Sequence, residues 1–416
     1  MSEPPEATAG KAEGRVSLLA GGKFTIHTIS TVFLFLVACL VVLPLVKTVF
    51  PKLALVPRLE ERRQLSAFPD PALLLKTDGG FAGGLNAWFD DRVGFRDLFI
   101  RTKNQIDYSL FHTSRKVYVG KHGWLFDRGA QDSLNTLDAS QLAAFEQRFT
   151  TLAGMLNDRG IRLVVIGYPT KSRIYPEMVP PDMPQIAPGG NDGRLRQFLA
   201  HQPTLTYIDA QTIFEREKVE SREHIYAQTD MHATEFGQLP VVKEIIARIA
   251  HLEGRPEIRW NENLTLTHHD YTGGEARFLA PLVPIVEKNF PWYQGSYTIG
   301  GAEPDGSWYL PDPHVLERAD DGIGRPFDWE FKSSPELCPQ RLPGMVLFGN
   351  SFSDLYWALG LHRYFCFIRR ARNPISRFKL FYETIPEGTK YFIFEFIFPW
   401  LPTDGPPIEQ IKSLGK

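Results

Sequence analysis

The fold is decided by a nearly continuous apolar stretch, Ile161-Arg162-Leu163-Val164-Val165-Ile166-Gly167. A strand of this composition is typical of a parallel sheet that is covered on both faces. It follows a segment with helical periodicity, 139–157, that ends at Asp158-Arg159-Gly160, a plausible helix stop. The sequence therefore predicts a helix that leads directly into a buried strand.

The alternation of helix and strand continues on both sides of this stretch. Other strands are predicted at 116–120, 123–126, 205–209, 345–349 and 391–396. Other helices are predicted at 85–111 with an interruption near Gly94, at 192–201, at 235–252 and from about 352 to 361. Such alternation indicates an α/β fold with a mostly parallel sheet between helices.

A long apolar segment precedes this region. No Lys, Arg, Asp or Glu occurs between Lys23 and Lys47, and a helix of this length spans roughly 35 Å, enough to cross a bilayer core. A buried core helix and a cleaved signal peptide are the alternatives. However, the run is longer than a signal peptide's apolar segment of about 7–15 residues, and no Ala-x-Ala site follows it. We therefore expect a retained transmembrane helix at 24–46.

The charged residues on either side of this helix give only a slight preference for its orientation in the membrane. More Lys and Arg residues follow the segment than precede it, which slightly favours a cytoplasmic C-terminal side. The rest of the chain is predicted to divide by composition into further parts. These are a disordered tail at 1–23, a connector at 47–80, a large domain at 81–400 with a loop-rich insertion at 255–340, and a C-terminal tail at 401–416.

Charge and cysteine content exclude several classes of function. The formal net charge of -2 gives no reason to expect nucleic acid as a partner. Cys39 lies in the apolar segment, so at most one disulfide, Cys338–Cys366, can form in a soluble domain. CxxC and Cys/His zinc spacings are absent, so the cysteines predict no metal site.

A candidate nucleophile, Ser351, follows the predicted strand 345–349. A sharp turn there exposes a hydroxyl at the carboxyl edge of the sheet, and N–H groups at the start of the next helix can stabilise an oxyanion. The alternative is that Ser351 is only the N-cap of that helix. Ser353 is a second, weaker candidate for the nucleophile.

A candidate base and its partner occur in Asp230-Met231-His232. On an extended loop these two side chains project to the same side, so the carboxylate can orient the imidazole that activates a serine. A metal site with Glu223 and His224 is the alternative, but no HExxH or other clustered-ligand pattern accompanies them.

The order of these motifs resembles the AlgJ/AlgX-like group of alginate and exopolysaccharide O-acetylation proteins, a permuted branch of the SGNH hydrolases. The likeness covers roughly residues 80–400. It is carried by Asp91-Arg92-Val93-Gly94-Phe95-Arg96, by Val119-Gly120-Lys121-His122-Gly123-Trp124-Leu125-Phe126, by the Pro169-Thr170-Lys171 to Pro180 loop, and by the Asp230 and Ser351 motifs. This chain departs from the group at Asn350, where Asp is usual, and at Ala233, where an aromatic residue is common.

The resemblance implies an SGNH-hydrolase-like three-layer α/β/α fold and a Ser351–His232–Asp230 catalytic triad. It further implies an O-acetyltransferase that needs no cofactor, a secreted polysaccharide as acceptor, and a membrane-bound O-acyltransferase partner that supplies acetyl groups. The expected location is the bacterial inner membrane, with the catalytic domain in the periplasm. We assign Lys171, Tyr175 and Asn350 to substrate binding, although Lys171 is equally suited to holding its own loop.

Two other functions are open from the sequence. The same triad can deliver acetyl groups to water, which would make the protein a carbohydrate acetyl-esterase. A non-catalytic scaffold of a polysaccharide secretion complex is the third reading. The sequence does not separate these, because the difference lies in whether the site excludes water and holds a sugar.

Overall fold

The computed structural model describes residues 26–50, 55–59, 64–75, 79–133, 138–184, 190–294, 301–302, 308–311, 329–372, 378–400 and 405–407. The tail expected at 1–23 and most of the one expected at 401–416 lie outside these residues. The chain forms two compact units, Met1–Phe99 and Ile100–Lys416.

The first unit contains the helix α1 (Ile26–Val49). Among the described residues, its segment Thr31–Thr48 is the one helical stretch that is long and apolar enough to cross a membrane, with a mean hydropathy of 2.4. Its large side chains are exposed, among them Phe33, Leu34 and Phe35. This exposure is unlike that of a core helix. The anchor stays a prediction that the length and composition of α1 favour.

A break near Gly94 separates α2 (Gly80–Arg92) from α3 (Arg96–Phe111), as predicted. The Gly94 N–H donates to the Thr48 hydroxyl at 2.9 Å. A Cβ at Gly94 would lie 2.1 Å from the Pro44 carbonyl oxygen, so a larger residue does not fit here. The break is therefore the point where the chain passes close against α1.

An eight-stranded sheet forms the centre of the second unit, in the order β4-β3-β12-β10-β11-β9-β8-β7. The first five strands in this order run parallel. The last three pair antiparallel at one edge. The strands are β3 (Arg162–Tyr168), β4 (Leu205–Asp209), β7 (Gly301–Ala302), β8 (Trp308–Pro311), β9 (Trp329–Lys332), β10 (Gly344–Gly349), β11 (Phe367–Arg372) and β12 (Thr389–Ile397).

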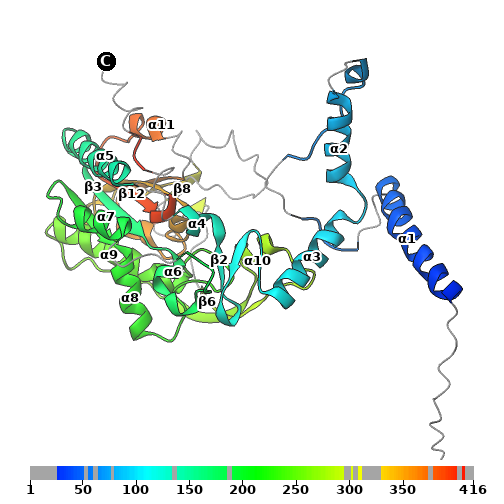
Figure 1. Ribbon diagram of the computed structural model, residues 1–416. Coiled ribbons are helices and arrows are strands. Elements are labelled where there is room, and N and C mark those ends of the chain that lie inside the picture. The colour runs from blue at the N-terminus through cyan, green and yellow to red at the C-terminus, as the bar shows by residue number, and fades with distance from the viewer. Residues whose placement is uncertain are drawn as a thin grey trace, which may run out of the picture. The chain divides into compact units, whose positions relative to one another are not determined.

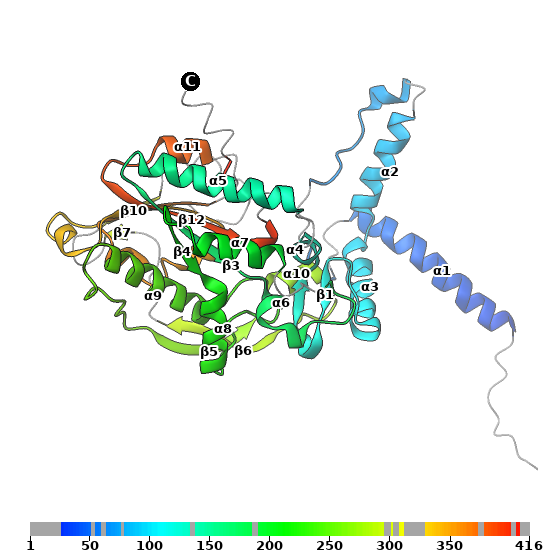
Figure 2. The same cartoon turned by 60° about the vertical axis from the view of Figure 1, so that its left-hand side comes forward.

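Helices cover both faces of this sheet, which gives the predicted three layers (Figure 1). Alternate side chains of β3, β10 and β12 enter two separate core clusters. One cluster includes α5 (Ala139–Asn157), α7 (Asn191–Ala200) and α11 (Phe378–Glu383), and the other includes α8 (Ala210–Glu220) and α9 (Glu235–Leu252). Figure 2 shows α5 and α11 above the sheet and α8 and α9 below it.

The helix predicted from about 352 to 361 is wrong. The chain forms a 3₁₀ helix, η6 (Ser351–Leu355), then a turn and a second 3₁₀ helix, η7 (Leu361–Tyr364). Tyr356, Trp357 and Leu359, within the turn, are all buried. Gly360 then adopts a left-handed conformation, with φ at 79°, that ends the turn.

The segment 255–340 has more regular structure than its composition indicated. It contains the hairpin of β5 (Thr265–Tyr271) and β6 (Glu287–Gln294), and the short helix α10 (Gly274–Leu279) between them. Its strands β7, β8 and β9 extend the main sheet. The segment therefore contributes directly to the core architecture.

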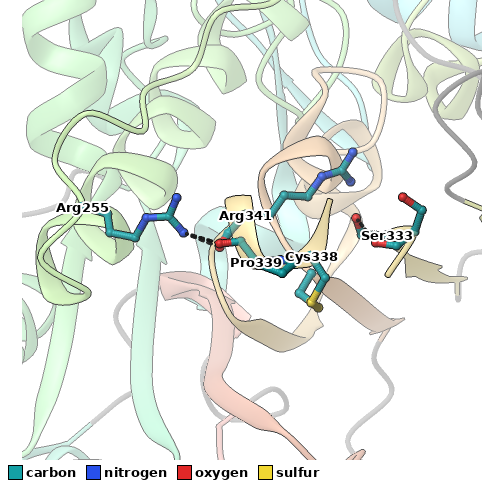
Figure 3. Close-up of a disulfide and its surroundings, with 7 residues drawn as sticks. Arg255, Ser333, Cys338, Pro339 and Arg341 are labelled. Atoms are coloured by element: carbon teal, nitrogen blue, oxygen red, sulfur yellow. Dashed lines mark hydrogen bonds between the residues drawn. A yellow bond between two sulfur atoms is a disulfide. The ribbon is translucent and has the colours of Figure 1, made fainter. Parts of the chain in front are cut away.

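A disulfide joins Cys338 to Cys366, the one pair that the sequence allowed (Figure 3). Beside it, Arg255 donates from its guanidinium to the Pro339, Gln340 and Arg341 carbonyls. The end of the segment 255–340 is thus tied to the start of β11 by a covalent bond and to the end of α9 by hydrogen bonds.

The hairpin of β1 (Val117–Val119) and β2 (Leu125–Asp127) matches the two short strands that the sequence predicts. The hairpin is followed by α4 (Arg128–Ser133). The loop after β3 holds α6 (Lys171–Ile174). These elements border the candidate site.

Candidate active site

Ser351 lies directly after β10, at the carboxyl edge of the sheet. Its turn, which we define as the serine turn (residues 349–354), is closed by Asn350, whose side-chain oxygen accepts from the Phe352 N–H at 2.9 Å. A Cβ at Gly349 would lie 2.5 Å from the Ser353 hydroxyl, so only glycine fits at the entry to the turn. The local sequence thus dictates a tight turn that leaves Ser351 partly exposed.

The three residues of the predicted triad come together. The Ser351 hydroxyl is 2.6 Å from His232 Nε2, although 119 residues separate them in sequence. His232 Nδ1 is 2.6 Å from Asp230 Oδ1. The Asp230 side chain is 7% exposed and that of His232 is 36% exposed, so the carboxylate lies inside while the imidazole faces the surface. A hydroxyl, an imidazole and a buried carboxylate in this order are the elements of an activated nucleophile.

Ser353, the weaker candidate for the nucleophile, is fully buried. Its hydroxyl donates to the Asn350 carbonyl at 2.9 Å and accepts from Arg370 at 3.0 Å. Its hydrogen bonds therefore stabilise the serine turn instead of facing a substrate.

The N–H groups expected to stabilise an oxyanion are mostly occupied. The Phe352 N–H bonds the Asn350 side chain, and the Ser353 N–H bonds Glu395. The Asn350 N–H also bonds Glu395. None of these bonds uses the N–H of Ser351 itself. Stabilisation of an oxyanion by the N–H of Ser351 stays a prediction, whereas the N–H groups of Phe352 and Ser353 are bonded to side chains.

Lys171 holds the loop that carries Asp230 and His232. Its ammonium group donates to the carbonyls of Ala227, Gln228 and Asp230 at 3.1, 3.1 and 2.7 Å. Burial lowers the pKa of Lys171, and nearby Glu275 opposes this shift. Of the two roles that the sequence left open, these bonds favour support of the loop over direct contact with an anionic substrate.

Tyr175 and Asn350, the other two residues assigned to substrate binding, are also buried. The Tyr175 hydroxyl accepts from the Ile225 N–H at 2.9 Å, and burial raises the pKa of this tyrosine to about 12. Tyr175 therefore supports the chain at Ile225, and Asn350 closes the serine turn.

The segment 255–340 supplies two donors that the sequence did not reveal. The Tyr271 hydroxyl donates to Asp230 Oδ2 at 2.9 Å, and the Gly274 N–H donates to the same oxygen at 2.6 Å. A Cβ at the adjacent Gly273 would lie 2.1 Å from the Thr229 carbonyl oxygen, so glycine is required for this close approach. In the sequence, the Gly273-Gly274 pair is the one feature that indicates a close approach of two backbone segments here.

These contacts set the charges of the pair. Burial alone would raise the pKa of Asp230, but hydrogen bonds from His232, Gly274 and Tyr271 outweigh it and lower that pKa well below its usual range. Burial alone would likewise lower the pKa of His232, but the bonded Asp230 carboxylate raises it above the ordinary value. The arrangement therefore stabilises an imidazolium, which is what a base at this position becomes when it takes the serine proton.

The metal alternative receives no support in the described part of the chain, where no three His, Cys, Asp or Glu side chains converge on one point. Glu223 instead pairs with His268, at 3.0 Å from its Nε2 atom. The His224 ring packs against Trp124.

A small pocket lies beside the triad. Two of its lining residues, Met231 and Phe352, are the sequence neighbours of His232 and Ser351. The other walls come from the β1–β2 hairpin, α4, the loop after β3 and the end of β12, with Phe126, Gln131 and Thr170 among their residues.

Residues 117–284 match the family model of the SGNH hydrolase-like domain of the acetyltransferase AlgX. The chain is also 27% identical over 233 residues to the probable alginate O-acetylase AlgJ of Pseudomonas aeruginosa, a match that covers 54% of this chain and 56% of that protein. It is 25% identical to the AlgJ protein of Pseudomonas syringae pv. tomato, over 55% of this chain and 58% of that one. Residues 117–284 are therefore similar to the SGNH hydrolase-like domain of AlgX, and the chain is similar to the two AlgJ proteins over a little more than half of its length.

The chain also aligns with the solved O-acetyltransferase domain of Pseudomonas putida AlgJ, with a TM-score of 0.43 and 15% identity, over 70% of this chain and 94% of that one. The chain spans a little more than half the length of the two AlgJ relatives. The family match includes Asp230 and His232 but ends before Ser351. The fold nevertheless brings Ser351 into contact with His232, which lies inside the matched region.

Proposed function

We propose that this protein is an O-acetyltransferase in which Ser351 is the nucleophile, His232 is the general base and Asp230 orients the base. The 2.6 Å contact between the Ser351 hydroxyl and His232 Nε2 carries this proposal. A serine hydroxyl is a weak nucleophile until a base within hydrogen-bond reach takes its proton. The names of the AlgJ relatives, probable alginate O-acetylases, support acetyl as the group transferred.

The reaction proceeds in two half-reactions. Ser351 Oγ attacks the carbonyl carbon of an acetyl donor while its proton passes to His232 Nε2, and the donor's leaving group departs with that proton. An acceptor hydroxyl then attacks the acetyl-Ser351 ester. Its proton passes to His232 and returns to Ser351 Oγ as the ester bond breaks, which regenerates the enzyme. The Ser351 hydroxyl itself is partly exposed, so a donor and an acceptor can reach it from the surface.

The acceptor we propose is a hydroxyl of a secreted polysaccharide. The word alginate in the names of the relatives supports this class of acceptor. We further propose that a membrane-bound O-acyltransferase supplies the acetyl groups, because an exported site has no access to cytoplasmic acetyl donors.

We propose that the protein is anchored in the bacterial inner membrane by α1, with the catalytic unit in the periplasm. The length and apolar composition of Thr31–Thr48 support the anchor. The Cys338–Cys366 disulfide supports the periplasmic side, because disulfides persist in oxidising compartments and are rare in the cytosol. This support runs against the slight preference that the charges around the anchor indicated.

Mass spectrometry of the intact protein with an activated acetyl ester tests the proposal, with and without candidate oligosaccharides. We expect acetyl on Ser351 that moves to sugar faster than to water, and no acetyl-enzyme in a Ser351→Ala variant. Acetyl lost only to water would favour an esterase. A Ser351→Ala protein that is still acetylated at the site would refute the nucleophile.

The fold of the Ser351→Ala variant needs a control. Ser353→Ala is matched, because it removes a hydroxyl two residues away in the same turn. Because the Ser353 hydroxyl helps to hold the turn, the rate should fall in Ser353→Ala, but acetyl-Ser351 should still form. Its loss only in Ser351→Ala would assign the chemistry to one hydroxyl. If the wild-type protein forms no acetyl-enzyme and a serine-reactive probe does not label Ser351, a non-catalytic scaffold is favoured.

A further inference from the structure

A buried carboxylate lies against the serine turn. Glu395, on β12, is fully buried, and its Oε1 atom accepts from the N–H groups of Asn350 and Ser353, both at 3.2 Å. These two N–H groups lie on either side of Ser351 in the chain. Glu395 therefore contacts the backbone that carries the serine without touching the serine itself.

A buried cation contacts the same turn from the opposite side. Arg370, on β11, is 1% exposed and donates to the Asn350 carbonyl at 2.7 Å and to the Ser353 hydroxyl at 3.0 Å. It also pairs with Asp354 at 2.5 Å. Because β10 lies between β12 and β11, each neighbouring strand supplies one charged side chain to the turn at the end of β10.

The stability of the fold does not by itself explain why Glu395 and Arg370 are buried. Burial of two charged groups carries a desolvation penalty that an apolar pair of similar volume would avoid. The sheet around them is otherwise packed with large apolar side chains, such as Phe348 and Ile393. The Glu395 carboxylate bonds the backbone of the serine turn, and the Tyr356 hydroxyl, just after that turn, is a further hydrogen-bond partner. These contacts point to a role in the geometry of the turn.

We propose that Glu395 is a positioning residue for the acetyl transfer. Its carboxylate fixes the two N–H groups that flank Ser351 and so holds the hydroxyl within hydrogen-bond reach of His232. This inference rests on the proposed function, because it assumes that Ser351 is the nucleophile. The proposed mechanism needs only the triad. Different experiments can therefore refute the Ser351 nucleophile and the positioning role of Glu395.

The ionisation of Glu395 adds a pH dependence to this role. Burial raises the pKa of Glu395 to about 7, although Arg370 and the two N–H donors oppose the shift. The other titratable groups near it are Tyr356 and Tyr168, whose pKa values burial and Glu395 raise well above the ordinary value. A protonated carboxyl accepts hydrogen bonds more weakly than a carboxylate. The serine turn is therefore held most firmly above neutral pH, where Glu395 is ionised.

The wild-type protein should then lose activity by two protonations as the pH falls, one on His232 and one on Glu395. Below both pKa values the logarithm of the acylation rate should change with pH with a slope of about two, where a single base gives about one. Geometry errors of about 1 Å at a reacting group cost up to roughly a hundredfold in rate. Loss of the carboxylate should therefore cost roughly tenfold or more.

The test measures the rate of acetyl-Ser351 formation from an activated acetyl ester between pH 5 and 9, in the full-length protein. Two variants are compared with wild type, Glu395→Gln and Glu395→Leu. Gln keeps the shape and an acceptor oxygen but, like the protonated carboxyl, is neutral and does not titrate, so its slope should fall to about one and its rate above neutral pH should fall toward that of the protonated wild-type protein. Leu removes the acceptor and should lower the rate roughly tenfold or more at all pH values.

The control is Glu235→Gln. Glu235 is also buried, with a pKa that burial raises to about 7, but it bonds the Tyr293 N–H at 2.8 Å. Its variant should keep the steep acid limb. A Glu395→Leu protein as fast as wild type, or a Glu395→Gln protein that keeps the slope of two, would overturn the inference. If Glu395→Leu does not fold, the slope of Glu395→Gln decides.

Acetylation that persists in Ser351→Ala would overturn the proposed function and the inference together. A wild-type rate in Glu395→Leu, with no acetylation in Ser351→Ala, would overturn the inference and leave the proposed function standing.

Discussion

The Tyr271 hydroxyl donates a hydrogen bond to Asp230 Oδ2 at 2.9 Å, across 41 residues of sequence. Asp230 uses its other oxygen for His232. The segment 255–340 therefore orients the buried carboxylate of the triad from behind, and His232 takes its direction from that carboxylate. Removal of the Tyr271 hydroxyl tests whether this segment contributes to catalysis.

Substitution Tyr271→Phe removes that hydroxyl and leaves the Gly274 N–H on the same oxygen. We expect the acylation rate to fall roughly tenfold, because a hydrogen bond to a charged group is worth about 1.5–3 kcal/mol and part of it is retained by Gly274. Tyr293→Phe, on the adjacent strand β6, is the matched control and should react at the wild-type rate. Equal rates for the two variants, measured by rapid mixing with an acetyl ester, would contradict this role.

Asp230→Asn should lower the acylation rate about 10⁴-fold, because the amide no longer stabilises the imidazolium. The pH profile should move as well. The Asp230 carboxylate raises the pKa of His232, so without it that pKa falls and the remaining activity persists to lower pH than in wild type. An acid limb that does not move, measured on the residual activity, would show that Asp230 does not set the charge of His232.

Asp230 should also make stability depend on pH. Its pKa is lower in the folded protein than in the unfolded chain, so its contribution is present above the unfolded pKa of about 4 and is lost as the pH falls further. Urea unfolding of wild type and Asp230→Asn at pH 3 to 7 checks this. The stability difference between the two proteins should shrink toward the acid end, and a constant difference would contradict it.

Lys171→Met should destabilise the protein by about 3 kcal/mol or more. The substitution removes three hydrogen bonds from a charged donor to the loop carbonyls, in a place that water does not reach. Lys218→Met is the matched control, since Lys218 is 30% exposed and pairs with Glu177 at the surface, where such pairs contribute less than about 1 kcal/mol. Similar urea midpoints for the two variants would mean that Lys171 does not hold the loop.

Reduction of the Cys338–Cys366 disulfide should lower the stability by about 3–4 kcal/mol. The bond closes a loop with a sequence separation of 28, and the loss of this constraint increases the entropy of the unfolded chain. Thermal unfolding with and without reductant measures the effect, with Cys39→Ser as a control that should not change it. Two free thiols at these positions in protein purified from its native membrane would argue against a periplasmic location.

The local elements of the fold were predictable because they depend on neighbouring residues. Helix α5 begins at the capping box of Asp138 and Gln141 and covers the predicted range 139–157, and β3 lies within one residue of the predicted apolar stretch. The helix after Ser351 was not predictable in this way. Contacts from Glu395 and Arg370, on strands far along the chain, compete there with the helical hydrogen bonds.

The sequence by itself determined the α/β architecture, the position of the apolar α1 helix and the single possible disulfide. Each of these follows from periodicity, from length or from residue positions. The three triad residues were a prediction that depended on the family resemblance as well as on short motifs. Only the tertiary structure decided that Ser351 contacts His232 and that Lys171 supports a loop. It alone also placed Tyr271 and Glu395 behind the triad. These contacts join residues that are 41 to 119 positions apart, and their geometry depends on how the strands pack side by side.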